Sequence, residues 1–175
     1  MKFELLTGGA VYIPDANRTE RIKKLYDLFG AALKNTGVRT PVITWHCMEA
    51  YLWCLRVTGH VDLAATAARE LESLPWPLDR CSDEQTDADA KAMQEVFDNV
   101  LGLKKAWDNN GSDLFDAESI SIAFVVLANV IYKLIGGLFS QEAADRFHKQ
   151  FTAASERSLE KVVSMAVPPT QEGFN

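Results

Sequence analysis

Four residues between positions 46 and 56 have side chains and a spacing that could support chemistry. His46, Glu49, Trp53 and Arg56 follow one another at intervals of three, four and three residues. On a helix this spacing places them in one row along a single face. A histidine can act as an acid, a base or a metal ligand, a glutamate can orient it, and an arginine can hold an anion. The alternative, which we favour, is structural: the row is where this helix meets solvent or a neighbouring helix.

A second polar row interrupts the strongly apolar segment ISIAFVVLANVIYKLIGG. Asn129 and Lys133 lie one turn apart on one face of the predicted helix. A buried lysine without a partner is strongly destabilising, so we expect Lys133 to reach the helix end or to pair with an acid. If the two polar rows face each other, Glu49 and Lys133 form an ion pair. As a candidate enzyme or ligand site this polar seam predicts a pocket between the two helices, with these members: His46, Glu49, Arg56, Asn129 and Lys133.

The sequence lacks the spacing of a metal site. With His46 on its second helix, the order of helices resembles that of DinB-like metal-binding bundles, in which such a histidine joins a His-x-x-x-His pair on a later helix. Here Asn129 and Lys133 occupy that spacing, and His60 and His148 have no such spacing. The sequence also lacks a glycine-rich phosphate loop, a Cys-x-x-Cys pair and a Gly-x-Ser-x-Gly motif. We therefore predict no metal and no cofactor.

Acidic residues are concentrated between positions 79 and 98. Seven acids and two bases give this stretch a local charge of −5, nearly the whole net charge of −6. A charged helix face is most often simply solvated, but acids so concentrated could also dock a basic partner. The repeated Glu-x-x-Asp could hold Mg²⁺, although both copies fall on one helix. One helical face carries five of the charged residues: Glu84, Asp87, Lys91, Glu95 and Asp98.

Trp76 is held between Pro75 and Pro77 in the break that follows the third predicted helix. A tryptophan on a rigid linker can anchor an interface, because it loses little entropy on binding. The alternative is that it closes one end of the bundle.

The remaining pattern predicts a single-domain, all-α bundle of about six helices. Residues 1–14 could form a small β-hairpin, the helical domain extends to residue 167, and 168–175 are a flexible tail. The predicted central helices, 41–58 and 117–135, are apolar nearly all round. Glycines and capping residues bound the helices, which are expected at 17–35, 41–58, 61–73, 86–107, 117–135 and 140–165. The fourth helix can start at Thr86 or at an earlier acid, and Trp107 is the last member of its apolar face. Ser140 caps the sixth helix.

Composition narrows the class of function. The chain has 175 residues and a net charge of −6, and no basic stripe is interleaved with aromatics, so we expect no direct nucleic-acid binding. Three unpatterned cysteines and the absence of a signal-peptide layout indicate a cytoplasmic protein.

We predict a small acidic protein that binds another macromolecule, as an inhibitor, immunity, antitoxin or host-takeover regulator does. Trp76, Glu84, Asp87, Glu95 and Asp98 would contact a protein with a basic surface. The alternatives are an enzyme or ligand binder using the polar seam, and membrane association through residues 120–139, which are long enough to cross a bilayer. The sequence leaves self-association open.

Overall fold

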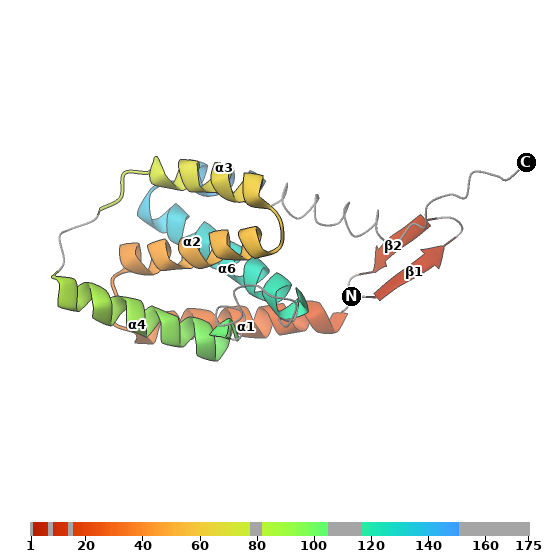
Figure 1. Cartoon of the computed structure of the whole chain (residues 1–175), viewed down its shortest axis with the longest axis horizontal. Coiled ribbons are helices and arrows are strands. Elements are labelled where there is room, and N and C mark those ends of the chain that lie inside the picture. Colours follow the sequence, from red (N-terminus) through yellow and green to blue (C-terminus); the bar gives the residue numbers. More distant parts are fainter. Residues whose placement is uncertain (1, 7–8, 14–15, 78–81, 105–116, 151–175) are drawn as a thin grey trace, which may run out of the picture.

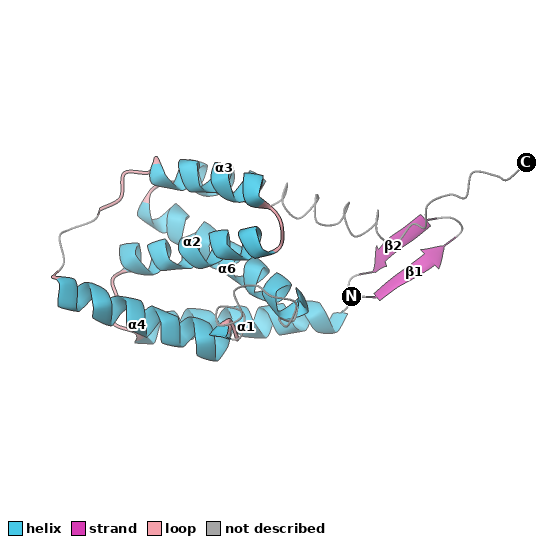
Figure 2. Ribbon diagram, in the orientation of Figure 1, coloured by secondary structure: helices cyan, strands magenta, loops and turns pink. Residues whose placement is uncertain are grey.

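A computed structural model of the chain describes residues 2–6, 9–13, 16–77, 82–104 and 117–150. Within these residues the protein is a bundle of helices preceded by a two-stranded antiparallel hairpin (Figures 1 and 2). Residues 141–150 are also helical. The prediction of an all-α bundle of about six helices is confirmed. The labelled elements are β1 (Lys2–Leu6), β2 (Gly9–Ile13), α1 (Ala16–Asn35), α2 (Thr40–Val57), α3 (Val61–Glu72), α4 (Asp83–Val100) and α6 (Ala117–Leu138).

Helices α2 and α6 form the centre of the bundle, as their apolar sequences predict. Helix α2 contacts α3, α4 and α6, and α6 also contacts α1. Figure 1 shows α1 and α4 side by side along one edge, α3 along the opposite edge, and α2 and α6 between them. Burying apolar surface from both central helices is the main driving force for this arrangement.

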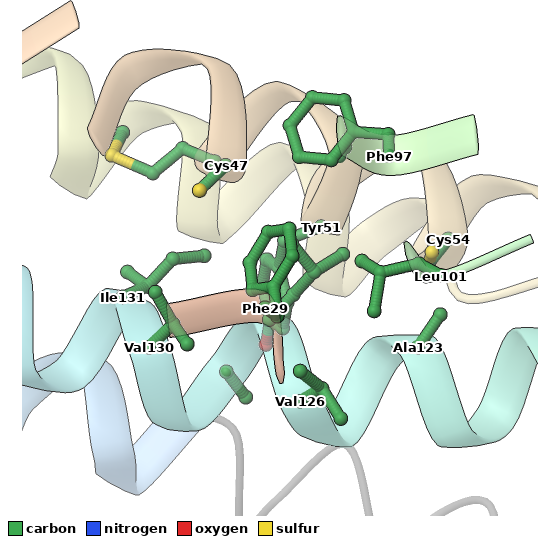
Figure 3. Packing of buried hydrophobic residues seen from close by; sticks show 14 of the residues in the cluster. Phe29, Cys47, Tyr51, Cys54, Phe97, Leu101, Ala123, Val126, Val130 and Ile131 are labelled. Atoms are coloured by element: carbon green, nitrogen blue, oxygen red, sulfur yellow. The ribbon is translucent and has the colours of Figure 1, made fainter. Parts of the chain in front are cut away.

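Aromatic rings join the outer helices to the centre. Phe29 of α1 stacks on Phe97 of α4, with ring centroids 6.0 Å apart. Tyr51 of α2 stacks on Phe124 of α6 at 4.8 Å and meets Phe147 of the last described helix at 5.2 Å. Figure 3 shows Phe29 of α1, Tyr51 of α2 and Phe97 of α4 meeting Val126 and Ile131 of α6 in one core.

Helix α4 begins at an acid before Thr86, which is one of the two predicted starts, and it ends earlier than predicted. It begins at Asp83, where the Ser82 hydroxyl accepts a hydrogen bond from the Gln85 amide at 3.3 Å. It ends at Val100, and Gly102 adopts a φ of +66°. Trp107, the expected last member of its apolar face, lies outside the described residues, as do the distal part of the sixth predicted helix and the tail 168–175.

Gly136 and Gly137 do not end α6, which corrects the predicted stop at residue 135. The helix continues through both glycines to Leu138, and neither has a positive φ. A side chain at Gly136 would meet Gln141 Oε1 at 3.5 Å and Ala144 Cβ at 3.7 Å. These are ordinary van der Waals distances, so α6 and the next helix are in contact at Gly136 and a Cβ would also fit there. Ser140 caps that helix, as predicted. Its hydroxyl accepts a hydrogen bond from the Ala143 amide at 3.1 Å.

Helix α6 is long and apolar enough to cross a membrane from Ile120 to Leu138, by length and composition. Half of that stretch is buried inside the bundle. Four of its side chains are fully inaccessible to solvent: Val126, Leu127, Ile131 and Ile135. Its packing against α1 and α2 accounts for its composition as a core helix.

Replacing Gly30 with alanine should stabilise the protein by about 0.5–1 kcal/mol, because glycine is a poor residue for a helix interior. Gly30 lies well inside α1, and a Cβ added there would meet no heavy atom within 4 Å. Gly37, just after the helix, also has open space but holds a φ of +72°. Gly37→Ala should therefore destabilise by about 1–2 kcal/mol. Urea unfolding of both variants tests the opposite signs, and two shifts of the same sign would contradict the assignment of this helix end.

Candidate functional site

The polar row of α2 lines one side of a cavity. His46, Glu49, Trp53 and Arg56 all border a cavity of about 460 Å³. Its other walls come from the end of α3 and the second half of α4, so it lies among α2, α3 and α4. The remaining lining residues are Trp45, Met48, Ala50, Leu52, Ala68, Leu71, Glu72, Gln94 and Phe97.

His46 and Glu49 form a pair within this cavity. The distance from His46 Nδ1 to Glu49 Oε2 is 3.3 Å, and the two side chains are 22% and 58% exposed. The hydrogen bond from His46 is the largest influence on the pKa of Glu49 and lowers it below its ordinary value, against the opposing effect of partial burial. A second hydrogen bond, from Trp45, acts in the same direction. The carboxylate thus stays ionised and holds the imidazole in one orientation.

Arg56 stands two turns from Glu49 at the exposed surface of the cavity. It makes no ion pair with any residue that the structure describes. The cavity therefore holds a cation, Arg56, and two carboxylates, Glu49 and Glu72.

The predicted polar seam between α2 and α6 is wrong in its geometry. Lys133 lies over the Tyr26 ring of α1, with its Nζ 5.2 Å from the ring centroid, and does not pair with Glu49. Its pKa is raised, chiefly by a hydrogen bond with Tyr26. Asn129 is exposed and donates to the Val125 carbonyl of its own helix at 2.8 Å. Helix α6 buries its apolar positions against α2 and leaves this polar row on the outside.

Lys133 instead lines a second cavity, of about 750 Å³, between α1, α6 and the start of α2. Tyr26, Asp27 and Lys34 also line it, with an apolar floor that includes Ile43. The five seam residues are thus divided: three line the first cavity, one lines the second, and Asn129 lines neither.

Trp76 has the packing of a residue that closes the bundle. Its indole makes edge contacts with Trp45 and Phe139, with centroid distances of 5.4 and 5.0 Å. Its Nε1–H donates to the Leu71 carbonyl at 2.8 Å. These contacts support the structural interpretation over the interface anchor.

The predicted acidic face of α4 is exposed. Glu84, Asp87, Lys91 and Glu95 are all exposed, and Asp98 is partly buried and accepts a hydrogen bond from Gln94 at 2.8 Å. Glu84, Asp87 and Glu95 form no ion pair with any other described residue. We call Glu84, Asp87, Glu95 and Asp98 the acidic stripe.

Another acid of this helix, Asp89, is buried and accepts from Gln85 Nε2 at 2.7 Å. It lies on the side of α4 that carries the core residues Met93 and Phe97, so it belongs to the packed face and not to the stripe.

Among the described residues, no three histidine, cysteine, aspartate or glutamate side chains are grouped so that they could hold a metal ion. No family model matches the chain, and no curated protein or solved structure was found to be similar to it. The candidate site is therefore defined by the fold and the surface: an all-α bundle with a polar cavity lined by aromatic residues, beside an acidic helix face.

Proposed function

We propose that this protein acts by binding, and that the acidic stripe on α4 docks a basic region of a protein partner. An inhibitor, an immunity protein, an antitoxin or a host-takeover regulator would act in this way. The observation that supports the proposal is that Glu84, Asp87 and Glu95 are exposed along one helix face and form no ion pair within the described structure. Lys91, on the same face, is a single cation among four acids, so the face stays negative.

Physical chemistry favours such a face for association. Neighbouring carboxylates of one sign repel each other and slightly destabilise an isolated helix. A partner that brings lysine or arginine side chains relieves this repulsion. The summed negative potential also accelerates the encounter with a positively charged surface, and salt weakens the effect.

The double reversal Asp87→Lys/Glu95→Lys should reduce capture of the partner by about tenfold or more, because it replaces attraction by repulsion at two points of contact. Affinity capture from a lysate of the source cells, at low and physiological salt, measures this. The matched control is Asp62→Lys/Glu70→Lys, which makes the same charge change at exposed positions of α3.

A partner bound stoichiometrically by the wild type and the control, lost with the α4 reversal and weakened by salt, would support the proposal. Equal capture of the partner by the two reversal variants would show that the acidic stripe does not contact it. Circular dichroism of each variant establishes that the helices are intact.

A further inference from the structure

The cavity among α2, α3 and α4 opens beside the acidic stripe. Helix α4 supplies Gln94 and Phe97 to the cavity wall. Asp87, Gln94 and Asp98 are spaced by seven and four residues, so they lie in one row of the helix. Gln94 Nε2 is 2.8 Å from Asp98 Oδ1. A segment bound along the stripe therefore passes the edge of the cavity.

The cavity walls have the chemistry to hold a cation with an apolar stem. Trp45 and Trp53 contribute indole rings, and an indole face attracts arginine and lysine more strongly than other aromatic faces do. Glu49 and Glu72 contribute carboxylates. Apolar lining such as Leu52 can contact the methylene groups of a long basic side chain. Its volume of about 460 Å³ lies within the range of binding pockets for small groups.

We propose that this cavity accepts an arginine or lysine side chain from the basic segment that docks on the acidic stripe. This inference rests on the proposed function and specifies it: the stripe attracts any basic segment, and the cavity selects one that presents a cationic side chain at the matching position. His46 is a positioning residue, because its Nδ1 lies 3.3 Å from Glu49 Oε2 and orients that carboxylate.

Arg56 provides a test of the charge of the bound group, because it is a cation among the residues that line the cavity. An entering guanidinium or ammonium group is repelled by Arg56 and attracted by Glu49 and Glu72. Removing the charge of Arg56 must then strengthen binding of a cation, whereas it would weaken binding of an anion. The sign of this one change distinguishes the two kinds of occupant.

The test uses a fluorescein-labelled oligoarginine peptide, with its affinity for the full chain measured by anisotropy at low salt. Glu49→Gln/Glu72→Gln should weaken binding about tenfold, since two carboxylates beside the bound cation are lost. Arg56→Gln should strengthen it about threefold. The control Asp62→Asn/Glu70→Gln removes the same charge from α3 outside this cavity and should change affinity less than about twofold.

An Asp87→Lys/Glu95→Lys protein, measured in parallel, separates the two proposals. If the reversal binds the peptide more weakly, but the cavity variants bind it with the same affinity as the control, the cavity proposal alone is overturned. Full binding by the reversal overturns the proposed function as well. Weaker binding by Arg56→Gln shows that the cavity takes an anion and also overturns the inference. A lower melting temperature of the Glu49→Gln/Glu72→Gln protein, with peptide affinity equal to that of the control, would also overturn the inference. The two carboxylates would then stabilise the fold and not bind the cation.

Discussion

Phe29→Ala should lower the free energy of unfolding by about 3–5 kcal/mol, the usual range for removing a buried aromatic ring. The Phe29 side chain is 0% exposed and stacks on Phe97 across the contact between α1 and α4. Figure 3 shows it in the middle of the labelled core side chains, which come from several helices. Alanine would leave a cavity beside Phe97 that the close-packed core cannot fill completely.

The neighbouring residue provides a matched control. Leu28 occupies the preceding position of α1 and is 61% exposed, so Leu28→Ala should change stability by no more than about 0.5 kcal/mol. Urea unfolding followed by circular dichroism measures both variants. Equal losses at the two positions would mean that α1 packs through a different face from the one described.

The face of α1 could be predicted because its local sequence contains the necessary information. Apolar residues at intervals of three and four define a single stripe, and Phe29 and Leu33 in that stripe are both buried. The same argument identified α2 and α6 as central helices. A helix that is apolar nearly all round can only be covered on several sides.

The polar seam could not be predicted from the same information. Each polar row was located correctly on its own helix, but the neighbour that a row faces depends on how each helix is rotated in the bundle. Helix α2 turns His46 and Glu49 toward α3 and α4, whereas α6 turns Lys133 toward Tyr26 of α1. Helical periodicity specifies faces and leaves the pairing of faces undetermined.

Glu72 and Gln94 of the cavity were missed for a related reason. Each is a polar residue on the exposed side of its helix, with nothing in the local sequence to distinguish it from its neighbours. They become lining residues only because the ends of α3 and α4 lie beside α2. The glycine pair of α6 shows the opposite error: a local stop signal was predicted, but glycine only permits a helix to end, and α6 continues through both glycines without a positive φ.

Cys47 and Cys54 should react with a thiol reagent at least about a thousandfold more slowly in the folded protein than in the unfolded chain. Both are 0% exposed free thiols. Burial raises the pKa of Cys54 from its ordinary 9.0 to about 12, and raises that of Cys47 as well. The thiolate is the reactive species, and such a rise in pKa leaves about a thousandth of the usual thiolate at neutral pH. Absence of solvent contact slows the reaction further.

Labelling with Ellman's reagent in a Cys81→Ser background measures this, since Cys81 lies outside the described residues. Reaction should then require opening of the core, so its rate reports the population of opened molecules. Adding Phe29→Ala should accelerate it about a hundredfold or more, because each 1.4 kcal/mol lost is a factor of ten in that population. Leu28→Ala should change the labelling rate by no more than about twofold. Fast labelling of the parent protein, or equal rates in the two alanine variants, would show that α2 opens to solvent independently of the core around Phe29.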